Sequence, residues 1–243
     1  MGNEIKKGLN TNSNTYTIIY SVIIVVVVAF LLAFVSKGLE EKQNENVALD
    51  KKKQILYSLN IRGLKDQEAT NKYNEAVLKD NIIDEEGNIL ELGEKGGINK
   101  GFRLNSADTK AGRLAIFECN IDGKKKFVVP VYGMGLWGPI SGYISINEDC
   151  KTIYGAYFNH ESETAGLGAE IKDNEDWQKS FKDKLIFDEE GKNVILSVNK
   201  KVDNPKSQVD AITGATLTSD GVSLMLQDGL KQYSKFFYRS QNN

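Results

Sequence analysis

The residues best suited to chemistry lie near the C-terminus, in the segment Asp-Ala-Ile-Thr-Gly-Ala-Thr-Leu-Thr-Ser at residues 210–219. Four of its side chains carry hydroxyl groups, and an amphipathic segment follows. A turn that opens onto a helix N-terminus offers unpaired N–H groups and the positive end of the helix dipole, which suit a phosphate. A threonine there can hydrogen-bond the phosphate or become esterified to it. The alternative is an ordinary helix cap rich in serine and threonine.

A second glycine-rich loop covers residues 132–139, Tyr-Gly-Met-Gly-Leu-Trp-Gly-Pro. Its tryptophan, Trp137, is either a plug in the core or an exposed aromatic platform. Taken alone, the loop favours the plug, because large aromatic side chains usually bury most of their surface. The segment lacks the third glycine of a dinucleotide-binding fingerprint, so we discount that interpretation.

A third loop covers residues 160–168, His-Glu-Ser-Glu-Thr-Ala-Gly-Leu-Gly. Its glycines expose backbone N–H groups, while Glu163 and Thr164 add an acceptor and a hydroxyl. By itself this pattern is more typical of a surface turn than of a site. His160 is the single histidine of the chain, and we interpret it as a hydrogen-bonded loop residue rather than a proton donor.

Composition excludes several classes of function. The 243 residues carry a net charge of −2 with acids and bases interspersed, so no basic surface for nucleic acid is expected. One histidine and two cysteines argue against a zinc site, so no metal site is expected. No phosphate-binding P-loop motif is present, and no catalytic residue is assigned. Cys119 and Cys150 allow either one disulfide or two buried thiols, and the sequence leaves both open.

The N-terminal region predicts a membrane anchor. No charged residue occurs from residue 8 to residue 36, and residues 18–35 are almost entirely aliphatic or aromatic. About 20 such residues suffice to cross the hydrocarbon core. A cleaved signal peptide is the alternative, because Lys6 and Lys7 precede the apolar run, but that run is long for one. A retained anchor is therefore preferred. Lysines flank both of its ends, so the charge bias does not give an orientation.

The remaining sequence changes from helical to strand patterns. Residues 37–84 show apolar residues at helical spacing and predict two helices separated near Arg62 and Gly63. From about residue 113 the pattern predicts strands, and later segments predict two helices. The expected strands are residues 113–119 and 126–132 joined by an Asp-Gly turn, 140–146 paired with 152–158, and 184–187 near 193–198. The expected helices are a short one at residues 175–181 and a last one that begins near Ser219 or Asp220, with Val222, Leu226, Leu230, Tyr233 and Phe237 facing inward.

These elements predict an α+β fold in which a single N-terminal transmembrane helix and a helical stalk precede a mostly antiparallel sheet with flanking helices. We expect three parts. Residues 1–36 form a cytoplasmic tip and the anchor, residues 37–100 form a helical membrane-proximal region, and residues 101–243 form the domain that carries the three loops.

Together the three loops resemble one family. The segment at residues 210–216 is similar to the flavinylation motif of proteins that bind FMN covalently, in which the last threonine, here Thr216, is esterified to the FMN phosphate. Residues 163–168 resemble the Glu-Thr-Pro-Gly-Leu-Gly loop of that family, with Ala165 where proline is usual. Gly-Leu-Trp-Gly-Pro at residues 135–139 resembles the C subunit of the sodium-translocating NADH:quinone oxidoreductase more than the related G subunit of the Rnf complex.

The resemblance implies a site and a role. The expected role is a membrane flavoprotein that relays electrons within a complex for ubiquinone reduction by NADH and for sodium transport. The chain is then an electron-carrying subunit of an ion-translocating enzyme, without an NADH or quinone site of its own. The alternatives are an Rnf-type G subunit, another FMN-binding electron carrier, and an anchored binding module without redox chemistry. The expected cofactor-binding residues are Thr216 as the covalent attachment, with Trp137, Glu163, Thr164, Gly166, Leu167, Gly168, Thr213, Gly214, Ala215, Leu217 and Thr218 around it.

The same resemblance implies partners and a location. Expected partners are the other subunits of the complex, membrane lipid, and a separate flavin transferase that uses FAD and a divalent metal ion. The expected location is the bacterial inner membrane, crossed once, with the C-terminal domain in the periplasm. Trp137 and Leu167 are expected beside the flavin ring, where apolar surface excludes water and tunes the cofactor.

Overall fold

The computed structural model describes residue 11 and residues 13–241, so the predicted cytoplasmic tip with Lys6 and Lys7 lies outside the described residues. The chain divides into two compact units, Met1–Ala48 and Leu49–Asn243. The first helix, α1 (Asn14–Ser58), is continuous across this division. The division expected at residue 100 stays a prediction.

Helix α1 carries the predicted anchor. Its aliphatic and aromatic side chains from Ile18 to Val35 are exposed, as befits a segment whose solvent is lipid rather than water or a protein core. Among the described residues, one helix is long and apolar enough to cross a membrane, and that helix is α1.

The region after α1 is partly helical, as predicted, and partly sheet. Helix α1 ends at Ser58 and α2 spans Asp66–Ala76, so the predicted break near Arg62 and Gly63 is confirmed. The expectation of helix as far as residue 84 is wrong, because Val77–Ile83 forms strand β1. β-branched residues in this segment pair with another strand and bury their side chains in the sheet, which outweighs the helical spacing of Tyr73, Val77 and Leu78.

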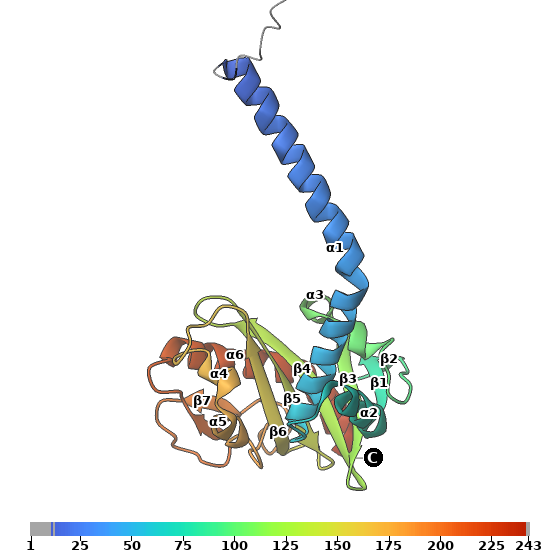
Figure 1. Ribbon diagram of the computed structural model, residues 1–243. Helices are drawn as coiled ribbons and strands as arrows, with labels where there is room; N and C mark the ends of the chain where they lie inside the picture. The colour runs from blue at the N-terminus through green and yellow to red at the C-terminus, as the bar shows by residue number, and fades with distance from the viewer. Residues whose placement is uncertain (1–10, 12, 242–243) are drawn as a thin grey trace, which may run out of the picture. The chain divides into compact units, whose positions relative to one another are not determined.

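Six strands form one antiparallel sheet in the order β2-β1-β3-β4-β5-β6 (Figure 1). The turn between β3 and β4 is the predicted Asp-Gly pair, with Asp122 at φ 51° and Gly123 at φ 78°. Two consecutive positive φ angles are those of a type I′ hairpin, whose twist matches that of the strands. The remaining strands of the sheet are β2 (Ile89–Glu91), β3 (Leu114–Ile121), β4 (Lys124–Met134), β5 (Pro139–Asn147) and β6 (Ile153–His160).

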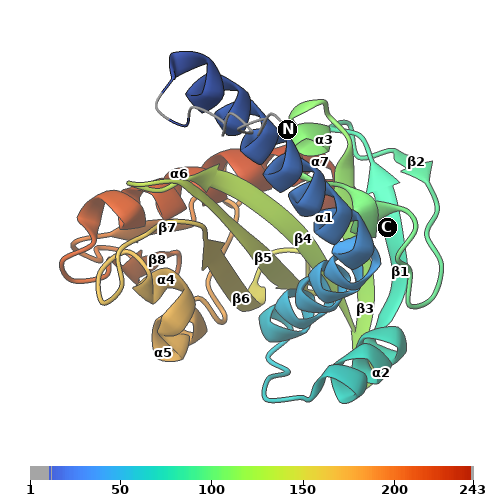
Figure 2. The ribbon, with the colours of Figure 1, turned by 45° about the horizontal axis from the view of Figure 1, so that its top comes forward.

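The sheet has different neighbours on its two faces, as alternating side chains require. Ile144 of β5 faces the main core, which it shares with residues of α6 (Thr216–Gln232). The next residue, Ser145, faces the opposite side, where its hydroxyl donates to the carbonyl of Ser58 at 2.5 Å. Figure 2 shows α6 crossing the sheet on one face. The expected inward residues of this helical region are confirmed, since Val222, Leu226, Leu230, Tyr233 and Phe237 are all buried.

Short elements surround the edge of the sheet formed by β6. Helix α5 (Glu175–Lys179) is the short helix expected at residues 175–181. The strands expected at residues 184–187 and 193–198 reduce to two isolated bridges, Thr152 with Leu185 and Phe187 with Val194, and to β7 (Ser197–Asn199), which pairs in parallel with β8 (Gln208–Asp210). The long last helix breaks at Tyr233, where α7 (Ser234–Gln241) follows. The other short helices are η1 (Gly101–Arg103), α3 (Ser106–Lys110) and α4 (Glu170–Asp173).

The two cysteines are separate, buried thiols. Both Cys119 and Cys150 are free, so of the two possibilities left open above, the structure has the thiols and not the bridge. Burial raises the pKa of the Cys150 thiol to about 11. Such a thiol stays protonated and unreactive at neutral pH.

Candidate functional site

The hydroxyl-rich turn leads directly into α6, earlier than expected. The helix begins at Thr216 with Ala215 as its N-cap, and within the described chain no side chain caps it. The prediction of a start near Ser219 or Asp220 is wrong, because the hydroxyl of Ser219 lies inside the helix. There it accepts a hydrogen bond from the N–H of Ile212 at 3.1 Å. This hydrogen bond folds the turn back onto the first turn of the helix. Because no side chain of the described residues caps the helix, its first N–H groups can bind an anion.

The start of the turn is held by a residue that sequence reasoning missed. The indole N–H of Trp177 donates to the carbonyl of Asp210 at 2.7 Å. The ring is 9 % exposed and packs between Phe158 and Phe181. A contact between residues 33 positions apart leaves no local signal, and only the helical pattern at residues 175–181 indicated that Trp177 had a fixed place.

All three predicted loops come together at the carboxylate of Glu163. One oxygen, Oε1, accepts the backbone N–H of Trp137 at 2.8 Å, and the other, Oε2, accepts the hydroxyl of Thr218 at 2.6 Å. The N–H of Glu163 donates to Nδ1 of His160 at 3.2 Å. His160 is therefore a hydrogen-bonded loop residue, as interpreted from the sequence.

The loop after Glu163 is a compact turn that contacts the hydroxyl-rich turn. The carbonyl of Thr164 accepts the N–H groups of Leu167 and Ala169, each at 3.1 Å. A Cβ added to Gly214, whose φ is 80°, would lie 3.0 Å from Cδ2 of Leu167. The turn therefore closes with alanine at position 165, and Leu167 touches the segment that leads to Thr216.

Apolar side chains around this point are exposed. They form an apolar rim, which consists of Met134, Leu136, Trp137, Leu167 and Leu217, with exposed fractions of 63, 47, 66, 44 and 60 %. Of the two interpretations of Trp137, the exposed platform is confirmed, and the plug that the loop taken alone favoured is wrong. Residues 135–138 form a tight turn at the tip of the β4–β5 hairpin, closed by Gly135 N–H donating to the carbonyl of Gly138 at 2.8 Å. Clustered exposed apolar groups indicate a binding surface.

Two of the predicted site residues are open to solvent. Thr213 is exposed, and Gly166 has φ 73° with no atom within 4 Å of the place that a Cβ would take. On the other side of the site, burial raises the pKa of Tyr132 to about 12, so this phenol stays protonated.

The first turns of α6 are pressed against the hairpin tip. A Cβ added to Gly221 would lie 2.3 Å from the carbonyl oxygen of Met134. Any larger residue at position 221 would push the helix away from the hairpin. Backbone contact, rather than side-chain packing, therefore sets the place of the helix start relative to Trp137.

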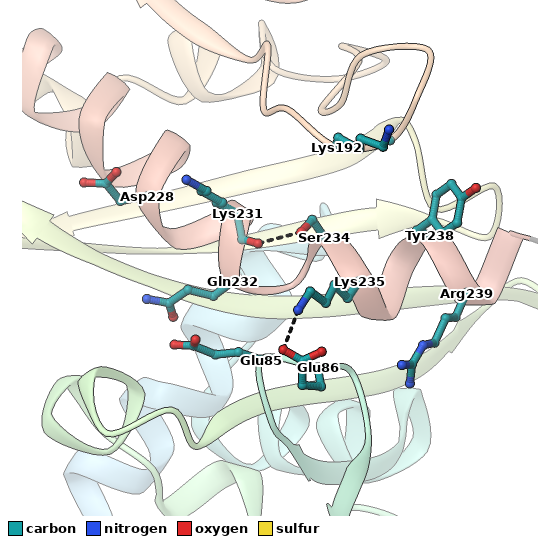
Figure 3. Close-up of a pocket in the computed structure, with 11 residues that line it drawn as sticks. Glu85, Glu86, Lys192, Asp228, Lys231, Gln232, Ser234, Lys235, Tyr238 and Arg239 are labelled. Carbon is teal, nitrogen blue, oxygen red and sulfur yellow. Dashed lines mark hydrogen bonds and ion pairs between the residues drawn. The ribbon is translucent and has the colours of Figure 1, made fainter.

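A cavity of about 760 Å³ lies at the other end of α6 and contains none of the predicted site residues (Figure 3). Charged side chains from α6, α7 and two loops line it, and Lys235 is paired there with Glu86. Its volume alone does not make it the site, because the hydroxyl-rich turn, the uncapped helix end and the apolar rim lie elsewhere.

Comparison with known proteins finds a match over the region that contains the three loops. Residues 135–231 match the family model of the FMN-binding domain. A relative from Haemophilus ducreyi, the C subunit of the Na(+)-translocating NADH-quinone reductase, is 43% identical over 96 residues, or 39% of this chain. That match spans 37% of the relative's own length. The protein of the same name from Vibrio vulnificus strain YJ016 is 30% identical over 200 residues, which cover 76% of this chain and 78% of the relative.

A solved structure agrees with the sequence matches. The crystal structure of the same C subunit from Parabacteroides distasonis has a TM-score of 0.74 and 36% identity, covering 82% of this chain and 96% of the other. This chain belongs to the family of the C subunit of the Na(+)-translocating NADH-quinone reductase. The expected α+β fold and the FMN cofactor are therefore confirmed at the level of the family and its FMN-binding domain.

The residues present fit FMN. An uncapped helix N-terminus with a hydroxyl at its first position suits a phosphate. The exposed apolar rim suits a flat, largely apolar ring. Both features lie on loops joined through Glu163.

Proposed function

We propose that this chain is a membrane-anchored electron carrier that holds FMN as a phosphoester on Thr216. Its place is within a sodium-translocating NADH:quinone oxidoreductase. The observation that carries the proposal is the position of Thr216 as the first residue of a helix without a side-chain cap among the described residues. Two residues later, the hydroxyl of Thr218 is bound by the same Glu163 carboxylate that accepts the N–H of Trp137. Bound FMN supplies reversible transfer of one or two electrons.

The chain's residues place and shield the cofactor. The N–H groups of the first turn of α6, from Thr216 to Thr218, face the phosphate position, and the helix dipole stabilises its negative charge by about 1–2 kcal/mol when partly buried. Thr213, Gly214 and Ala215 form the turn that leads to the attachment oxygen, and Gly168 packs against Thr218. The apolar rim lies against the ring and excludes water from it.

Attachment requires a flavin transferase, because among the described residues no carboxylate or imidazole is hydrogen-bonded to the hydroxyl of Thr216 to activate it. The transferase forms the bond from Oγ of Thr216 to the phosphorus of the FMN half of FAD. It breaks the bond to the AMP half, and the hydroxyl proton leaves with this exchange. Thr216 is half-buried, so its oxygen remains reachable from solvent.

The location and the partners are part of the same proposal. The apolar segment of α1 anchors the chain in the bacterial inner membrane, lipid surrounds it, and the C-terminal domain lies in the periplasm beside other subunits of the complex. The relatives' names support membership of such a complex. Protease digestion of intact spheroplasts should remove the C-terminal domain, and protection of this domain would contradict the orientation.

Mass spectrometry of the attachment peptide tests the function. The full chain is expressed with and without the transferase, and the peptide covering residues 207–231 should gain the mass of FMN minus water only when the transferase is present. Thr216→Ala should abolish the adduct, and Ser223→Ala, at a hydroxyl of the same peptide outside the proposed site, should keep it. A colourless protein after co-expression, or an adduct that survives Thr216→Ala, would overturn the proposal.

A further inference from the structure

The carboxylate of Glu163 touches all three site loops. It belongs to the 160–168 loop, it accepts the N–H of Trp137 at 2.8 Å, and it accepts the hydroxyl of Thr218 at 2.6 Å. The residue is 7 % exposed. Each oxygen thus has a donor from a different loop of the protein.

The surroundings leave the carboxylate little freedom. A Cβ added to Gly135 would lie 2.5 Å from Oε1, and one added to Gly168 would lie 2.4 Å from Oε2. The backbone of Glu163 is itself fixed by the hydrogen bond to His160 at 3.2 Å. Backbone therefore packs closely against the group from two sides, and the two hydrogen bonds orient it.

A neutral side chain would hold the loops less firmly. Hydrogen bonds to an ionised carboxylate are shorter and roughly twice as strong as those between neutral groups. Burying the charge is costly, but its two donors and the nearby N-terminus of α6, where Thr218 is the third residue, offset that cost. The negative charge of Glu163 therefore serves hydrogen bonds within the protein.

We infer that Glu163 is a positioning residue. Its carboxylate fixes the 135–138 turn to the first turn of α6, so that the side chain of Trp137 stays beside the flavin. It acts through Trp137 and Thr218 and does not itself contact the ring. The part of this inference that involves the flavin rests on the function proposed above. The link between the loops does not, and it exists in the chain before any cofactor arrives.

Hydrogen exchange of the full, flavin-free chain in detergent tests the link between the loops. In Glu163→Ala, the peptide that contains residues 135–138 should exchange about tenfold faster, because a buried N–H loses a charged acceptor. Glu163→Gln should restore part of the protection, since its amide oxygen still accepts the N–H of Trp137 but as a weaker, neutral acceptor. Glu161→Gln, at an exposed position of the same loop, should match the unaltered chain.

A second variant covers the possibility that Glu163→Ala does not fold. Thr218→Val preserves the shape of the side chain and removes only the donor to Oε2, so exchange at residues 135–138 should rise to an intermediate value. Unchanged exchange at these residues in Glu163→Ala, or in Thr218→Val where Glu163→Ala does not fold, would overturn the inference, whatever the flavin content.

Flavin fluorescence of the matured chain tests the positioning. An indole beside a flavin quenches its emission by electron transfer, so Trp137→Phe should raise the fluorescence per bound flavin. Glu163→Ala should raise it toward the same level, with Glu161→Gln unchanged and Glu163→Gln between the unaltered chain and Glu163→Ala. If Trp137→Phe brightens the flavin and Glu163→Ala does not, the inference fails. If no chain carries flavin, the proposed function fails, while the exchange result still decides the role of Glu163.

Discussion

The two ends of helix α6 differ in chemistry, although both are open to solvent. At the N-terminal end the helix is uncapped, the nearby charge of Glu163 is buried, and the apolar rim is exposed. The C-terminal end leads to the cavity of about 760 Å³, where two of the cationic side chains already have partners. Lys235 pairs with Glu86, and Arg239 donates to Asn88 at 3.0 Å. Unsatisfied donors and exposed apolar surface identify the site better than the volume of a hollow.

The charged side chains near the two ends of α6 have the signs that the helix dipole favours. A carboxylate lies near the positive end, and Lys231 lies in the last turn at the negative end. The two ends should therefore be separable, because stability depends mainly on the core around the C-terminal end and cofactor binding on the loops at the N-terminal end. Substitutions at both ends test whether stability and cofactor binding can be changed independently. Stability is measured for every variant.

Phe237→Ala should have the largest effect on stability. The side chain is fully buried and contacts Phe127 and Phe187, so its removal should lower the free energy of unfolding by about 3–5 kcal/mol. Denaturant unfolding measures the loss. Flavin per folded molecule should be unchanged, and a parallel loss of attached flavin would show that the two ends are coupled.

Gly168→Ala should have an intermediate effect, with a consequence for the site. Its Cβ would lie 2.4 Å from Oε2 of Glu163 and 2.6 Å from Oγ1 of Thr218, so overpacking should cost about 1–3 kcal/mol and lower flavin attachment. Gly191→Ala is the matched control at the other end. Its Cβ would meet the exposed ring of Tyr238 at 2.9 Å, so it should reduce stability but not attachment. Equal attachment in the two variants would contradict the separation.

Lys235→Gln should change stability little. Its ion pair with Glu86 is exposed, with side-chain fractions of 53 % and 61 %, and exposed pairs contribute about 0–1 kcal/mol. Thermal unfolding at low salt should detect the difference, and high salt should remove it. A larger loss that persists in high salt would indicate that this end is held by more than surface charge.

Trp137→Ala should have the smallest effect on stability, within about 0.5 kcal/mol, because the side chain is 66 % exposed. Its effect on the bound flavin should nevertheless be clear, as a change in the visible circular dichroism of the matured chain. An unaltered flavin spectrum would remove Trp137 from the proposed ring site.

Local signals in the sequence predicted much of the fold. Asp122-Gly123 specified a type I′ hairpin because both residues tolerate positive φ, and the β3–β4 pair followed from it. The three glycine-rich loops stood out by residue type, but each alone also fitted an ordinary cap, plug or turn, and only their joint resemblance to one family indicated a site. Their convergence needed the structure, because Glu163 and Thr218 lie 55 positions apart.

The errors occurred where two local interpretations were equally allowed. Ser219 and Thr216 can both stand at a helix start, and the hydrogen bond of the Ser219 hydroxyl to Ile212 decided between them. Val77 fits a helical pattern and a strand, and pairing with Cys119 of β3 decided for the strand. A tryptophan in a glycine-proline loop carries no sign of which way it points, so the exposure of Trp137 was beyond sequence reasoning.

The close approach of Gly221 to the carbonyl of Met134 affects which amino-acid substitutions this protein can accept during evolution. Backbone packs against backbone there, so the position of Thr216, the proposed attachment residue five residues earlier, is fixed to the sheet by atoms that substitutions elsewhere do not alter. Side chains of the apolar rim can therefore change by substitution, while the position of Thr216 relative to the sheet stays the same.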